Sequence, residues 1–181
     1  MRWMIGMAAL ALASGAGAQD ADAERFAYGP VFDRHGQHAA VDGLDFAVPD
    51  GVRLRHSFDV SKKAESGEST HIASAARFVN MHVASGMDRN ALNVVVVVHG
   101  GATLDLLTDE ARAAKGEGDT NPSGPLVRAL LAEGVRVVLC GQSLSAHGLA
   151  KSDLIPGVEL ALSAMTAHAV LQQQGYTVNP F

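Results

Sequence analysis

Five consecutive valines, Val94 to Val98, constrain the fold of this 181-residue chain more than any other feature. The run is β-branched throughout and too short for most helices, so it predicts a strand that is buried on both faces. A second apolar run, from Val135 to Cys140, has the same character. Strands of this kind occur in parallel sheets that helices cover on both sides. The sequence therefore predicts an α/β protein.

The segments around these two runs alternate between extended and helical patterns. We expect strands at 52–60 (an edge strand), 93–98, 135–140, 158–162 and 176–178, and helices at 70–84, 104–115, 123–134, 145–152 and 164–174. This order predicts a three-layer sandwich, in which a mostly parallel sheet of about five strands has helices on both faces. The predicted domain spans 52–181, and an extended N-terminal arm rich in turn residues spans 19–51.

The first 18 residues have the pattern of a secretory signal peptide. Arg2 supplies a positive charge, residues 4–12 form a short apolar stretch, and Ala16-Gly17-Ala18 is a small-residue cleavage pattern. The apolar stretch is too short to cross a bilayer comfortably. We therefore expect a periplasmic protein that has no membrane contact once the leader is cleaved.

Composition indicates a globular protein that does not bind nucleic acid. Hydrophobic residues make up 48% of the chain, which is enough for a proper core. The formal net charge is −5, and lysine and arginine form no cluster that could neutralise phosphates.

Cys140 is the only cysteine of the chain and lies at the end of a predicted strand, where ligands and chemistry collect in parallel α/β folds. An unpaired cysteine in an exported protein is a reactive thiol, half of an intermolecular bond, or a small buried hydrophobe. Residues from Gly141 to Ser145 are expected to open a helix, whose N–H groups would stabilise a thiolate. Gly141 permits a close backbone approach, and Gln142 and Ser143 offer hydrogen bonds.

The valine run ends in the same way as the run to Cys140, with a polar or reactive residue and then glycine. The residues after Val98 are His99, Gly100 and Gly101. If the two apolar strands are neighbours, this segment lies beside the thiol. The imidazole would then supply a proton acceptor or a cation, and the glycine amides would form an anion nest. In the alternative interpretation, His99 is a strand-end residue that hydrogen-bonds a carbonyl.

Two groups of side chains have metal-ligand chemistry but match no recognised zinc spacing. They are Cys140, His99 and His147 in one group, and Asp33, His35 and His38 of the arm in the other. We expect no resident metal and no cofactor, and we interpret the arm group as a solvated loop. His168 shares a predicted helix face with Met165 and Leu171 and is interpreted as structural.

Several sequence blocks together resemble the DsrE/DsrF-like family, in its exported, periplasmic branch. The blocks are Tyr28-Gly29-Pro30, Ala76-Arg77-Phe78-Val79-Asn80-Met81-His82, Val97-Val98-His99-Gly100-Gly101-Ala102, Asn121-Pro122, Leu139-Cys140-Gly141-Gln142-Ser143, Asp153-Leu154-Ile155-Pro156-Gly157, and most of 163–181. The resemblance implies an α/β sandwich that assembles as trimers or hexamers. It also implies that the cysteine at the matching strand end, Cys140, carries sulfur as a persulfide within a relay.

Two functional hypotheses follow. In the first, the protein handles sulfur in the periplasm, and Cys140 accepts sulfane sulfur from a small sulfur species or a sulfur-donor protein. Cys140 and His99 would act in catalysis, and the substrate-binding residues would be Gly100, Gly101, Gly141, Gln142 and Ser143. In the second, the protein is a non-enzymatic oligomeric module that binds a small anion or a metal ion, with Cys140 structural or a ligand. The reactivity of the thiol in the folded protein separates the two.

Overall fold

Five parallel strands form one sheet, in the order β4-β3-β2-β1-β5. A computed structural model describes residues 25–180, so the predicted leader lies outside the described residues. The strands are β1 (Leu54–Val60), β2 (Leu92–Val98), β3 (Arg136–Cys140), β4 (Glu159–Ala161) and β5 (Thr177–Pro180). The predicted α/β class and the number of strands are confirmed.

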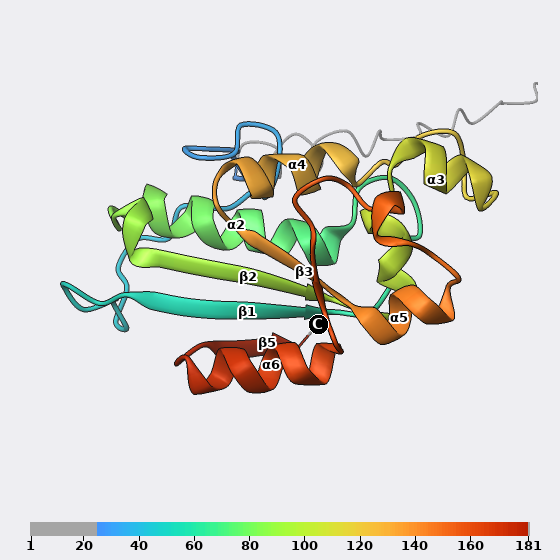
Figure 1. Cartoon of the computed structure of the whole chain (residues 1–181). Helices are drawn as coiled ribbons and strands as arrows, with labels where there is room; N and C mark the ends of the chain where they lie inside the picture. The colour runs from blue at the N-terminus through green and yellow to red at the C-terminus, as the bar shows by residue number, and fades with distance from the viewer. Residues whose placement is uncertain (1–24, 181) are drawn as a thin grey trace, which may run out of the picture.

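Helices cover both faces of the sheet, as expected, and Figure 1 shows the three layers. Helices α2 (Thr70–Ala84) and α4 (Gly124–Ala132) lie on one face, and α6 (Ala164–Gln173) lies on the other. Within residues 25–180 the other helices are the short α3 (Asp109–Ala114) and α5 (Gly141–Ala146), together with 3₁₀ turns η1 (Arg89–Ala91), η2 (Gly100–Leu106) and η3 (Lys151–Asp153). No helix in the described part of the chain is long and apolar enough to cross a bilayer.

The valine run is apolar throughout because both of its faces are buried. Val94, Val96 and Val98 pack into the larger core, on the side of α2 and α4. Val95 and Val97 point the other way and pack with Cys140 and α6 in a smaller core. Side chains alternate along a strand, so a strand whose two faces are both buried is apolar on both sides, as β2 is from Val94 to Val98.

Three expected elements differ from the structure. The strand at 52–60 is not an edge strand, because the C-terminal strand β5 pairs with its outer side. In place of the single helix expected at 104–115, the structure has the end of η2 and the short α3. Helix α3 begins after Thr108, because the hydroxyl of Thr108 accepts a hydrogen bond from the N–H of Ala111 and caps the helix. The helix expected at 145–152 begins earlier, directly at Gly141, and the chain turns at Gly148 with a φ of 61°.

The chain before β1 contains no helix and no extended strand from Arg25 onward, and a single antiparallel bridge joins Ala27 to His38. Phe32, 3% exposed, belongs to the larger core, and Asn80 of α2 hydrogen-bonds the backbone on both sides of it. The boundaries placed at 19–51 and 52–181 stay a prediction.

His56 on β1 is expected to make the fold sensitive to acid. Its ring stacks on Phe78 with the centroids 4.9 Å apart, and its Nδ1 lies 2.7 Å from Oγ1 of Thr177 on β5. Burial lowers the pKa of His56, and the nearby His82 lowers it further. The unfolded chain therefore binds a proton at this position more readily than the folded chain. Stability should be complete above the ordinary histidine pKa of about 6.5 and decline as the pH falls below it.

The thermal midpoint of unfolding, measured at pH 8 and at pH 5.5, checks this. The His56→Phe variant keeps the ring stack but has no proton to gain, so its midpoint should fall less between the two pH values than that of the wild type. Thr177→Val serves as the matched control, because it removes the hydrogen bond to β5 and leaves the imidazole in place. An equal fall in the wild type and in His56→Phe would contradict the assignment.

Candidate functional site

The carboxyl ends of β1, β2 and β3 bring the candidate site together. Val60 pairs with Val98, and Val98 pairs with Leu139, so the next residues along β2 and β3 are neighbours at the same edge of the sheet. These residues are His99 and Cys140. The expectation that the two apolar strands lie side by side is therefore confirmed, and open α/β sheets bind ligands at this edge.

Four hydrogen-bond donors surround the Cys140 thiol. It is the last residue of β3 and the N-cap of α5, and it is 6% exposed. Burial raises the pKa of this thiol, but hydrogen bonds from the hydroxyl and N–H of Ser143 and from the N–H groups of Ala164 and Gln142 lower it, and the net pKa lies below its ordinary value. The donors come from the first turns of α5 and α6. The sulfur is thus held where a thiolate is favoured.

A chain of hydrogen bonds fixes the direction in which Ser143 donates. The N–H of Gly100 donates to Oγ of Ser143 at 2.9 Å, which leaves the hydroxyl proton for the sulfur of Cys140. Nε2 of His147 lies 3.0 Å from the carbonyl oxygen of Gly100 and donates to it. The φ of Gly100 is 55°, a conformation that favours glycine. The amide of Gly100 therefore acts on Cys140 through Ser143.

Gly141 and Gln142 bind the site to the end of β4. A Cβ atom at Gly141 would lie 2.7 Å from the carbonyl oxygen of Ala161, so a larger residue would push β4 away from β3. The side chain of Gln142 donates to the carbonyl oxygen of Leu162 at 3.3 Å. Gly101 lies on the other side of the site, exposed, against the backbone of Lys63.

His99 is bonded to a carboxylate and not to the carbonyl that the alternative interpretation expected. Its Nε2 lies 3.1 Å from Oδ1 of Asp59, and Nε2 of His168 lies 2.9 Å from the same oxygen. Asp59 pairs in register with Val97, and Val97 pairs with Val138, so it projects from the α6 side of the sheet, as Cys140 does. The structure brings His168, which we interpreted as structural, into the same cluster.

Asp59 is the functional candidate that sequence reasoning missed. The signal was a polar residue at an inward position of a strand, between Phe58 and Val60, with no local partner. Its partner on α6 lies 109 residues away in the sequence, and only the fold brings the two together.

The two groups considered for metal binding have other partners. His147 bonds the backbone of Gly100, as described above. In the arm, Nδ1 of His35 lies 2.6 Å from a carboxylate oxygen of Glu68, and Nε2 of His38 lies 2.9 Å from the carbonyl oxygen of Gly29. The His35 side chain is 13% exposed, so the interpretation of this segment as a solvated loop was wrong there. Within residues 25–180, no three histidine, cysteine or acidic side chains are placed to hold a metal ion.

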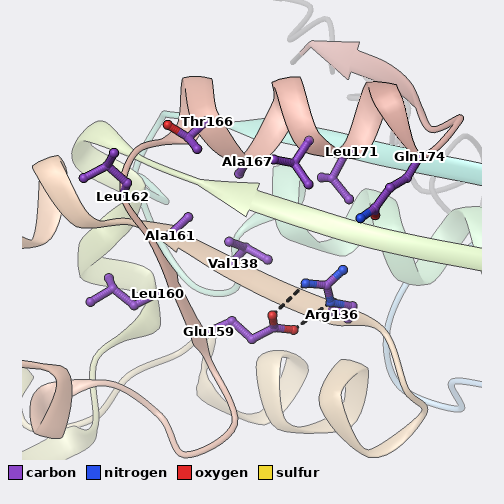
Figure 2. Close-up of a pocket in the computed structure, with 11 residues that line it drawn as sticks. Arg136, Val138, Glu159, Leu160, Ala161, Leu162, Thr166, Ala167, Leu171 and Gln174 are labelled. Atoms are coloured by element: carbon purple, nitrogen blue, oxygen red, sulfur yellow. Dashed lines mark hydrogen bonds and ion pairs between the residues drawn. The ribbon is translucent and has the colours of Figure 1, made fainter.

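A groove of about 270 Å³ lies beside the site, between α6, β3 and β4. Figure 2 shows the ion pair of Arg136 and Glu159 at one end, and Ala161 and Leu162 at the other. Ala161 pairs in register with Cys140, so the second end lies one strand away from the thiol, and Cys140 itself is not among the lining residues. The walls are mostly apolar, and Leu162 is 73% exposed. The groove was not expected from the sequence.

Comparisons with known proteins agree with this architecture. The structure resembles a protein of unknown function, MTH1491, from Methanobacterium thermoautotrophicum (TM-score 0.51, 21% identity, covering 71% of this chain and 99% of that one). It also resembles the YchN protein from E. coli (TM-score 0.50, 18% identity, covering 71% of this chain and 100% of that one). At these identities the likeness shows the fold alone. No curated protein matches. The model of the DsrE/DsrF-like family matches residues 58–180, and the chain belongs to that family.

Proposed function

We propose that this protein carries sulfane sulfur on Cys140, as a persulfide, in a sulfur relay. The observation that supports the proposal most is the hydrogen-bonded thiol. Donors from two helix starts lower the pKa of Cys140, although the side chain is buried. A thiolate is the form of cysteine that attacks sulfur. Membership of the DsrE/DsrF-like family supports a role of the sulfur-relay type.

The same donors serve both states of the carrier. In the resting state they stabilise the thiolate, and after loading they face the anionic persulfide that replaces it. His99, at the end of the neighbouring strand, is the candidate for moving a proton. Ser143, Gln142 and Gly141 hold the thiol in place. The groove along α6 ends at Ala161, one strand away from Cys140, and is the route that we propose for a sulfur donor.

We further propose that the carrier works in the periplasm as a homo-oligomer, without nucleic-acid or membrane partners after the leader is cleaved. The leader pattern of residues 1–18 supports the location. Apolar side chains that face solvent around the groove support self-association. Three of them are Leu162, Met165 and Val170, exposed to 73%, 80% and 46%.

Intact-mass measurement of the purified chain tests the carrier function. After incubation with glutathione hydropersulfide, we expect the mass of the wild type to rise by one sulfur atom and to return when a thiol is added. The Cys140→Ser variant should gain no mass, because Cys140 is the only cysteine of the chain. If no sulfur is gained and Cys140 resists alkylation until the protein is unfolded, the thiol is structural. The protein is then better described as a module that binds a small anion or a metal ion.

A further inference from the structure

A carboxylate shared by two imidazoles lies on the same side of the sheet as Cys140. One oxygen of Asp59 accepts from Nε2 of His99 at 3.1 Å and from Nε2 of His168 at 2.9 Å. The three side chains come from β1, from the residue after β2, and from α6. The side chains of His99, Asp59 and His168 are 31%, 26% and 16% exposed. The cluster therefore opens to solvent on the side of His99.

The shared oxygen determines where the protons lie. A carboxylate only accepts, so both rings carry a proton on Nε2, and Nδ1 of each ring is the atom that can gain or lose one. Within the described chain, Nδ1 of His168 is buried and has no hydrogen-bond partner. Of the two rings, His99 is the more exposed, so its Nδ1 is the ring nitrogen better placed to exchange a proton with a ligand.

Resting on the proposed function, we infer that Asp59 is a positioning residue that holds His99 as the proton donor to the thiolate that leaves when Cys140 is loaded. The Cys140 thiolate attacks the outer sulfur of a hydropersulfide, R–S–S–H. A new S–S bond forms, the old one breaks, and its electron pair leaves on R–S⁻.

The protons balance without an external oxidant or reductant. His99 in its imidazolium form gives a proton to R–S⁻, which departs as R–SH, and then takes the proton of the new Cys140–S–S–H. The net reaction converts Cys140–S⁻ and R–S–S–H into Cys140–S–S⁻ and R–SH. His168 completes the arrangement by binding the other side of the same carboxylate oxygen, which fixes the direction of Asp59.

Alkylation separates this role from a structural one. Iodoacetamide consumes the same thiolate but releases iodide, which needs no proton. Asp59→Asn should lower the rate of sulfur uptake from glutathione hydropersulfide at least tenfold, because general-acid assistance contributes a factor of roughly 10² to 10⁴. Its rate of alkylation should stay within about twofold of the wild type if the thiolate is unchanged. Asp59→Glu should restore part of the uptake.

A double-variant comparison tests whether Asp59 acts through His99. The Asp59→Asn/His99→Gln double variant should load no more slowly than His99→Gln alone. Three outcomes would overturn this inference and leave the proposed function standing. The losses of the two single variants multiply in the double variant, Asp59→Asn loses uptake and alkylation equally, or Asp59→Asn takes up sulfur as fast as the wild type. A wild type that takes up no sulfur overturns the proposed function, and this inference with it.

Discussion

Replacing Asn80 by alanine is expected to lower the free energy of unfolding by at least about 3 kcal/mol, because several backbone groups lose their partner and each buried group left unpaired costs about 1 to 3 kcal/mol. Asn80 is fully buried on α2. Its Oδ1 accepts from the N–H groups of Val31 and Phe32, and its Nδ2 donates to the carbonyl oxygens of Phe32, His35 and Gly36. These five hydrogen-bond contacts, three of which share the two hydrogens of Nδ2, hold the segment before β1 against the helix.

The segment also lies directly against the backbone of α2. A Cβ atom at Gly36 would lie 2.2 Å from the backbone nitrogen of Arg77, so the two backbones are in direct contact. Chemical denaturation gives the loss of stability, and limited proteolysis should show new cleavage between residues 25 and 51. Gln37→Ala, at an exposed position of the same segment, is the control and should change stability by less than about 0.5 kcal/mol. Equal effects of the two substitutions would contradict this account.

The elements that were predicted well are those whose pattern is local. The helix expected at 70–84 is observed at the same residues, because Ser69 caps it and Ile72, Ala75 and Val79 form one buried stripe. The valine run was placed in the sheet because burial on two faces leaves no polar position in a strand. One helix was also expected between Leu104 and Lys115. In the structure Leu106, the last residue of η2, and Leu107, directly after it, fill the core. Tertiary packing therefore determines the local structure of this segment.

The part of the candidate site that was predicted from the sequence is the part formed by residues at the ends of strands. Cys140 and His99 could be placed together because parallel strands end at the same edge of a sheet. The role of Asp59 could not be inferred, since its contact with His168 joins β1 to a helix that is far away in the sequence. The position of β5 could not be inferred for the same reason. β5 pairs with β1 although the two strands are far apart in the sequence, and this pairing places β1 inside the sheet.

Replacing Ser143 by alanine is expected to raise the pKa of Cys140 by about one unit and to slow its alkylation by about tenfold at pH values below that pKa. The hydroxyl is one of the four donors that lower this pKa, and a hydrogen bond to a charged group is worth about 1.5 kcal/mol or more, which corresponds to about one pKa unit. The substitution also leaves the N–H of Gly100 without the acceptor that it has in the wild type. The rate of reaction with iodoacetamide, measured between pH 5 and pH 10, gives the pKa directly.

Two further variants separate the hydrogen bond from general disturbance of α5. Ser143→Thr keeps a hydroxyl in place, so its alkylation midpoint should stay close to that of the wild type. Ser145→Ala changes an exposed serine of the same helix and should leave the midpoint unchanged. No shift in Ser143→Ala would mean that the N–H groups of Gln142, Ser143 and Ala164 set the thiol pKa without the hydroxyl. A shift of the same size in Ser145→Ala would mean that the effect of Ser143→Ala comes from a general disturbance of α5. With the expected result, the hydrogen bond from Gly100 to Ser143 links the end of β2 to the reactivity of the sulfur on β3.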